Sequence, residues 1–135
     1  MLDAYLVPEK TVITAKGDSQ ALAIEPAASR VFLVTLSITS VVEQESIEVS
    51  IFTSADGTTW DAKAITTLPQ KFYIGEYPML VDLTSATEAK FVRAHWEVSR
   101  WGRGPTGARF EIGLRCREVP AEALREAQLE AQTRR

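Results

Sequence analysis

The sequence predicts an all-β fold: a two-sheet antiparallel β-sandwich of the jelly-roll type, followed by one C-terminal α-helix. The first observation is the alternation in segment 45–54, where Ile47, Val49 and Ile51 stand at every second position. Such alternation is typical of a strand with one buried face. The second observation is an acidic–glycine dipeptide directly after this segment. The third is a series of similar short segments bounded by turn residues.

The dipeptide Asp56-Gly57 predicts a tight hairpin turn at the end of the first segment. Both central residues of a type I′ turn need a positive φ, and these two residue types tolerate it best. Trp60 then falls on the predicted return strand, where we expect it to pack across the hairpin.

Further strands are expected on both sides of this hairpin. In segment 64–68 the following Pro69 limits the predicted strand to an edge or an end of a sheet. Segment 72–77 is interpreted as a strand that runs into a loop. The other predicted strands are 11–15, 21–24, 30–42, 79–83, 91–99 and 108–117. About eight strands at this spacing fit a two-sheet sandwich.

Alternation also predicts which side chains of the long strands face the core. The expected inward residues are Phe32, Val34, Leu36 and Ile38, then Val92, Ala94, Trp96 and Val98, and finally Ala108, Phe110, Ile112, Leu114 and Cys116. These positions require two stacked layers that share one core.

The chain changes character after the last predicted strand. Pro120 suits a first helical turn, and Ala, Leu, Glu, Gln and Arg dominate the residues that follow. We therefore expect one domain of residues 1–118 and a C-terminal helix or tail over 119–135. The apolar side chains of this helix are few and small, so it is marginal alone and needs the sandwich or a neighbouring subunit.

Composition is that of one ordinary soluble domain of 135 residues. Cys116 is the only cysteine, so an intrachain disulfide is impossible and a reducing compartment is indicated. The start lacks a signal-peptide pattern, and no apolar run approaches the roughly 18 residues of a membrane span. We expect a protein that is cytoplasmic at synthesis and that can later enter an assembled particle.

The net charge of −3 conceals an asymmetry along the chain. Residues 1–89 carry 5 basic and 12 acidic side chains, whereas residues 90–117 carry 7 basic and 2 acidic ones. Such a chain could pair head to tail with copies of itself or bind an anion locally. The alternative explanation of the asymmetry is that edge and outward positions of the strands happen to carry arginine without any binding role.

No catalytic or metal-binding constellation stands out. His95 is the only histidine and is expected at the surface or an interface, and Cys116 is expected to be a buried, inert thiol. Asp56 and Asp61 could contribute oxygen ligands to calcium, but the turn already explains Asp56. The sequence therefore predicts a protein that is not an enzyme and that uses no cofactor or metal.

The predicted loop 100–107 contains the best candidate surface, because it holds Arg100, Trp101 and Arg103 together. Arginine and tryptophan can stack a sugar or a base or clamp an anion, and they are also enriched in subunit contacts. We favour the contact. Arg93 and His95, on the outward face of segment 91–99, complete the candidate interface or ligand loop. A pI of about 5.2 argues against a dedicated nucleic-acid reader.

Two resemblances rest on these segments. Thr35–Thr39, the run 47–60 and Phe91–Val98 resemble small β-sandwich structural proteins of tailed bacteriophages and prophages. That resemblance implies a virion component, such as a head-decoration or tail-associated protein, present in many copies.

The second resemblance is to discoidin-like galactose-binding domains. Ser54, Asp56, Gly57 and Trp60 match their hairpin, Phe91-Val92-Arg93 a late strand, and Arg109–Ile112 the closing strand. Cys116 falls one place late and its disulfide partner is missing, so this resemblance implies a fold and no ligand site.

These observations predict a non-enzymatic structural protein that self-associates or joins a larger assembly. The alternative is a carbohydrate-binding module that uses Arg100, Trp101 and Arg103 with Tyr73 and Tyr77. Neither alternative involves a membrane.

Overall fold

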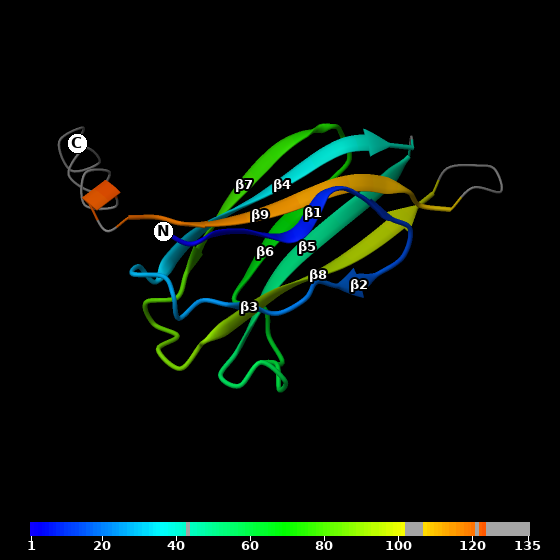
Figure 1. Cartoon of the computed structure of the whole chain (residues 1–135). Coiled ribbons are helices and arrows are strands. Elements are labelled where there is room, and N and C mark those ends of the chain that lie inside the picture. The colour runs from blue at the N-terminus through cyan, green and yellow to red at the C-terminus, as the bar shows by residue number, and fades with distance from the viewer. Residues whose placement is uncertain (43, 102–106, 121, 124–135) are drawn as a thin grey trace, which may run out of the picture.

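The computed structural model describes residues 1–42, 44–101, 107–120 and 122–123. It is an all-β protein with two antiparallel sheets (Figure 1). The first sheet has the order β1-β9-β4-β7, with β1 at Asp3–Ile13, β9 at Phe110–Glu118, β4 at Val31–Val41 and β7 at Gly75–Asp82. The second has the order β2-β8-β5-β6, with β2 at Gly17–Asp18, β8 at Phe91–Arg100, β5 at Glu45–Ser54 and β6 at Thr66–Lys71. The short strand β3, Leu22–Ala23, also pairs with β8.

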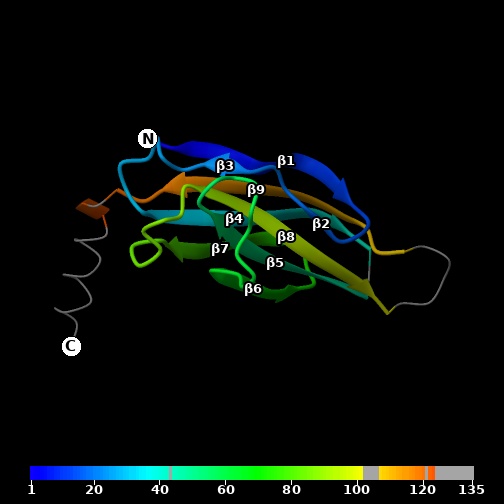
Figure 2. The ribbon, with the colours of Figure 1, turned by 90° about the horizontal axis from the view of Figure 1, so that it is seen from below.

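The core lies between the two sheets, as the alternation predicts. Ile47, Val49 and Ile51 of β5 are fully buried, and they belong to the same apolar cluster as the inward residues of β4 and β9. Phe110, Ile112, Leu114 and Cys116 of β9 are all at most 1% exposed. Because every second residue of each central strand enters this cluster, the arrangement is sandwich-like. In Figure 2, seen from below, the strands of the two sheets overlap as superposed layers.

The predicted tight hairpin at Asp56-Gly57 is wrong. Of the two residues only Gly57 has a positive φ, +83°, so a type I′ turn does not form. The Asp56 Oδ1 instead accepts hydrogen bonds from the backbone N–H groups of Thr58 and Thr59 at 2.9 and 2.8 Å, which stabilises a wider loop. This loop, 55–65, connects β5 to β6, and Trp60 lies within it rather than on a return strand.

The N-terminal part of the chain also differs from expectation. Strand β1 begins at Asp3 instead of residue 11 and contains an irregularity between Val7 and Thr11, where Lys10 has a φ of +62°. This bulge breaks the period-two pattern, which is why the sequence does not reveal the strand. Gly17 and Asp18, which follow the predicted strand 11–15, form β2 and pair with Trp96 and His95 of β8.

Prolines inside strands occur at sheet edges. Pro8 lies in β1, Pro69 in β6 and Pro78 in β7, and each of these strands ends the order of its sheet. The expected edge position before Pro69 is thus confirmed, although β6 runs from Thr66 to Lys71. The expected break after Tyr77 is wrong, because β7 continues through Pro78, which pairs in register with Thr35. An edge strand tolerates proline because only one of its sides is paired.

The predicted C-terminal helix covers 119–135, and most of this range lies outside the described residues. Within the described part of the chain, no helix is long and apolar enough to cross a membrane.

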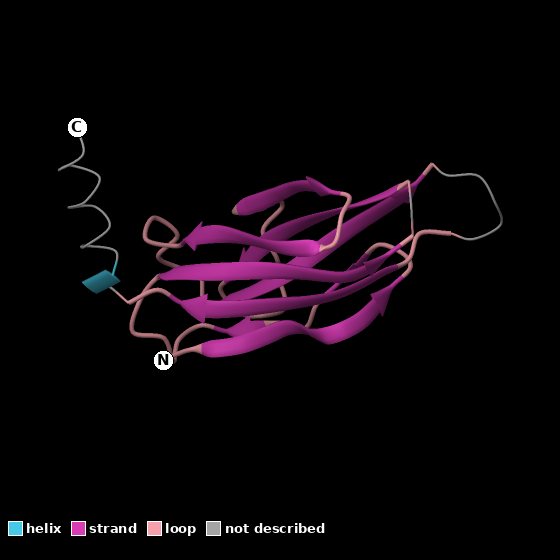
Figure 3. Ribbon diagram, turned by 90° about the horizontal axis from the view of Figure 1, so that it is seen from above, coloured by secondary structure: helices cyan, strands magenta, loops and turns pink. Residues whose placement is uncertain are grey.

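The strands, although antiparallel, all lie along one long axis of the molecule (Figure 3). The connections between them therefore gather at the two ends of this axis. We call the end formed by the described residues 14–16, 42, 44, 72–74, 101 and 107–109 the aromatic end. The opposite end, formed by segments 24–30, 55–65 and 83–90, we call the acidic end. Each segment joins two strands whose register is fixed by the sheets, so residues distant in sequence meet at each end.

Candidate functional site

The aromatic end carries an exposed apolar cluster from two separate connections. Phe72, Tyr73 and Ile74 form the turn between β6 and β7, and Trp101 follows the last residue of β8. The Phe72 ring lies edge-to-face against Trp101, with centroids 5.8 Å apart, and 6.3 Å from the Tyr73 ring. Trp101 is 57% exposed and Tyr73 75% exposed. We call these four residues the aromatic cluster.

Backbone and carboxylate contacts hold this end in place. Trp101 N donates to Gln44 O at 3.0 Å, which ties the end of β8 to the β4–β5 turn. Glu45 is only 1% exposed, and its two carboxylate oxygens accept hydrogen bonds from Val42 N at 2.7 Å and Arg109 N at 2.6 Å. A buried carboxylate is tolerated when backbone donors satisfy it in this way.

A hollow of about 420 Å³ lies beside the aromatic cluster. Its walls combine the rings of Phe72, Tyr73 and Trp101 with Val41, Gln44 and Glu45. Tyr77 does not line the hollow but holds the turn beside it, since its hydroxyl donates to the Tyr73 carbonyl at 2.7 Å. Lys71 Nζ lies 5.0 Å from the centroid of the Tyr77 ring. The hollow is open, aromatic and polar at one rim, which suits a side chain or a ring of a partner molecule.

The predicted interface residues fall into two separate groups. Trp101 belongs to the aromatic cluster, and Arg100 is the last residue of β8, paired in register with Glu45, so Arg100 is a strand residue and not part of a loop. Arg103 lies outside the residues that the structure describes. Arg93 and His95 are nearer the middle of β8, with His95 roughly 20 Å from Trp101 at about 3.3 Å per strand residue.

Arg93 and His95 form a charged cluster on the outer face of the second sheet. His95 Nδ1 lies 2.8 Å from Asp18 Oδ1, and Nε2 lies 2.9 Å from Glu97 Oε1. Arg93 stacks over the Trp60 ring at 4.5 Å and lies 3.8 Å from Asp18. These contacts join β2 and loop 55–65 to β8. His95 is partly exposed, as expected of a surface residue.

The hydrogen bond to Glu97, and then that to Asp18, raises the pKa of His95 above its ordinary value, against the opposing effect of burial. Both ring nitrogens can donate only in the protonated form. The cluster thus joins separate elements of this chain through charged contacts.

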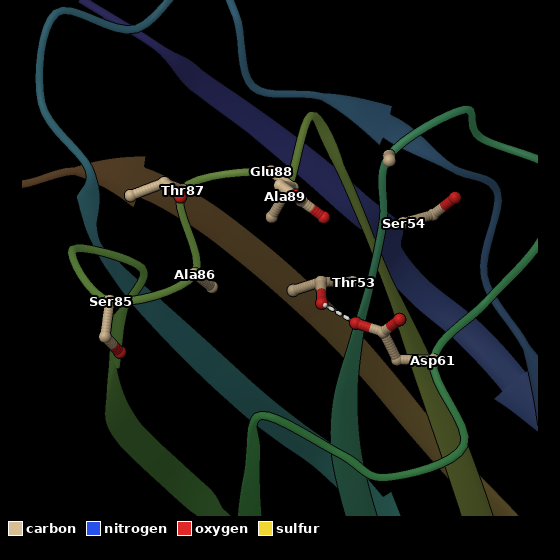
Figure 4. Close-up of a pocket in the computed structure, with 9 residues that line it drawn as sticks. Thr53, Ser54, Asp61, Ser85, Ala86, Thr87, Glu88 and Ala89 are labelled. Atoms are coloured by element: carbon tan, nitrogen blue, oxygen red, sulfur yellow. Dashed lines mark hydrogen bonds between the residues drawn. The ribbon is translucent and has the colours of Figure 1, made fainter.

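A polar hollow of about 250 Å³ opens at the acidic end, between loops 55–65 and 83–90 (Figure 4). Asp61 points across it toward Thr53, whose hydroxyl donates to Asp61 Oδ2 at 2.8 Å. Ser85, Ala86, Thr87, Glu88 and Ala89 form the other wall. That wall is held from behind, because the Arg30 guanidinium donates to the carbonyls of Ala86 and Ala89.

The Asp56 carboxylate and the Cys116 thiol, two groups that could take part in chemistry, both have structural roles. Hydrogen bonds from the backbone of Thr59 and Thr58 and the hydroxyl of Ser54 lower the pKa of Asp56, so this carboxylate serves its loop. Burial raises the pKa of the Cys116 thiol to about 12, which confirms the expected buried thiol. Among the described residues, no three His, Cys, Asp or Glu side chains cluster as metal ligands would.

Sequence reasoning identified Trp101 but missed Phe72 and Gln44 as its neighbours. Their proximity depends on the strand order, which brings the β6–β7 and β4–β5 turns to the same end as the close of β8. The aromatic-rich run 72–77 was the only available signal.

No protein-family model matches the chain, and a search of curated proteins finds no significant match. The strand order and the exposed side chains define an all-β, sandwich-like fold with an exposed aromatic end.

Proposed function

We propose that this chain is a non-enzymatic structural protein that self-associates, and that the aromatic cluster is part of its contact surface. The observation that carries the proposal is the exposure of Phe72, Tyr73, Ile74 and Trp101 together at one end. Exposed large apolar side chains that adjoin one another mark interaction sites, and tryptophan and tyrosine dominate binding energies at such sites.

The strand order supports a finer description of the fold as a jelly roll. If β2 and β3 count as one interrupted strand, eight strands remain, and each sheet alternates strands from the two halves of the chain. Jelly rolls occur in viral capsid proteins and in lectins. The fold therefore agrees with a virion component of the phage type but does not select it, because function depends on the site.

The test is self-association of the full chain as a function of concentration. Sedimentation velocity of the wild type is expected to show species larger than a monomer that dissociate on dilution. Trp101→Ala is expected to weaken association at least tenfold, because the loss of a central aromatic side chain commonly costs 2 kcal/mol or more. Tyr5→Ala, which removes an exposed aromatic from β1, is the matched control and should leave association unchanged. A wild type that remains monomeric throughout would refute the proposal.

A carbohydrate-binding module is the second candidate, favoured by the hollow in which Gln44 lies beside the rings of Tyr73 and Trp101. Aromatic faces can stack on a sugar while the amide bonds its hydroxyls. Calorimetric titration with a broad sugar panel tests it. Binding that Gln44→Ala abolishes while self-association persists would support this function, and the absence of heat with every sugar would remove it.

A further inference from the structure

The two ends of the molecule carry opposite charge. Around the aromatic end, the connections and the strand residues that flank them contain four described basic residues: Lys16, Lys71, Arg100 and Arg109. The one described acidic residue there, Glu45, is buried and bonded to backbone N–H groups. The described residues of this end therefore carry net positive charge, with Lys16 exposed and Lys71, Arg100 and Arg109 half-buried.

The described charged residues of the acidic end, counted in the same way, give a net negative charge. The described acidic residues are Glu25, Asp56, Asp61, Asp82 and Glu88, all exposed, against the basic residues Arg30, Lys63 and Lys90. Arg30 donates to backbone carbonyls and Lys90 lies 3.7 Å from Glu25, so two of the three cations are already engaged. Asp61 and Glu88 line the hollow of Figure 4, which is open to solvent.

We infer that copies of this chain associate head to tail, the aromatic end of one copy against the acidic end of the next. This inference rests on the proposed function and specifies its geometry. The aromatic cluster supplies the apolar contact, and the basic residues around it face the acidic residues around the hollow. A contact between two different ends of identical molecules is heterologous, and it produces rings or open chains rather than a closed dimer.

Charge complementarity favours this arrangement over an isologous contact. Two aromatic ends that face each other would bring Lys71, Arg100 and Arg109 of both copies together, and like charges at a contact oppose association. Head-to-tail contact brings opposite charges together instead. Association through exposed charges is screened by salt. We therefore expect the assemblies to shorten as the sodium chloride concentration rises.

Two blocked variants test the geometry. The first carries Tyr73→Asp and Trp101→Asp and lacks a functional aromatic end. The second carries Glu25→Arg and Glu88→Arg and lacks a functional acidic end, while Asp61 keeps its bond to Thr53. A control with Glu9→Arg and Glu48→Arg, within β1 and β5, has the same change in net charge as the second variant, away from both ends.

Each blocked variant alone should sediment as a monomer at concentrations where the wild type forms species larger than a dimer. An equimolar mixture of the two should form a 1:1 dimer, in which the aromatic end of the second variant contacts the acidic end of the first. This dimer should not grow, because both of its outer ends are blocked. The control should assemble like the wild type. Circular dichroism of each variant establishes that it is folded before the mixture is measured.

A dimer of the second variant alone would overturn the inference, since it would show contact between two aromatic ends while self-association itself survived. Monomers in the mixture of two folded variants would also overturn it. A wild type that never associates would instead refute the proposed function, so the two failures are distinguishable.

Discussion

At the scale of single residues, a few charged side chains join segments that are distant in sequence. Glu118, at the end of β9, accepts hydrogen bonds from the backbone N–H groups of Leu2, Ala28 and Ser29. His95 likewise joins Asp18 of β2 to Glu97 of β8. None of these pairings could be predicted from the sequence, because polar side chains carry no periodic signal that indicates their partners.

Glu118 makes stability sensitive to acid. Its backbone hydrogen bonds, that from Leu2 first, lower its pKa below the ordinary value of 4.5. The carboxylate therefore contributes stability above pH 4.5 that is lost as the pH falls through the lowered pKa of the folded state. Glu118→Gln should be less stable at neutral pH and lose less stability on acidification, as measured by urea denaturation at several pH values. Glu76→Gln, at an exposed position, is the control and should follow the wild type.

The contribution of His95 to stability depends on pH in the opposite sense. Its pKa in the folded state is raised above 6.5, so its contribution is fully present below pH 6.5 and is lost as the pH rises through the raised value. His95→Gln should flatten this part of the stability profile in thermal denaturation between about pH 5 and 8. Ser50→Ala, at the position paired with His95, should keep the wild-type slope. An unchanged slope in His95→Gln would mean that the two carboxylate contacts do not couple to folding.

At the scale of elements, alternation predicted the central strands well and the first strand poorly. β4, β5, β8 and β9 are long and paired on both sides, and most of their alternate residues are buried. β1 lies at an edge, and its residues 8–10 bulge out over Gly113 of β9. A bulge moves side chains off the period-two pattern, and only the partner strand explains it.

Gly113 leaves little room for a side chain beneath that bulge. A Cβ at this position would lie 3.1 Å from the Cα of Glu9, a backbone atom that cannot move without the strand. Gly113→Ala should destabilise the protein by about 1–3 kcal/mol, the usual cost of overpacking. Gly107→Ala is the control, since a Cβ there meets nothing within 4 Å and should change stability by less than about 0.5 kcal/mol. Chemical denaturation of both variants measures the difference.

At the scale of the whole molecule, the candidate site depends on topology more than on any one segment. Sequence joined Trp101 and Tyr73 only in the carbohydrate-binding alternative, and the strand order brings both to one end. It also separates Arg93 and His95 from them by most of a strand. The charge asymmetry along the chain was visible in the sequence, but its distribution between two ends required the register of every strand.

Cys116 reports on the integrity of the whole sandwich. It is 1% exposed in the central strand β9, and burial raises its pKa to about 12, so the native thiol should resist alkylation at neutral pH. Labelling with iodoacetamide should proceed only as fast as the sandwich opens, and urea should accelerate it in step with unfolding. Mass spectrometry follows the label, and rapid modification without denaturant would contradict the burial of this strand.

The prolines of the outer strands have a consequence for the behaviour of concentrated solutions. Pro8, Pro69 and Pro78 each remove a backbone donor from the margin of a sheet. An incoming extended peptide cannot zip continuously onto such a margin, so amyloid-like lateral growth is disfavoured even when many copies crowd together. Crowded copies would then keep these strands in their native pairings, and they could separate again without refolding.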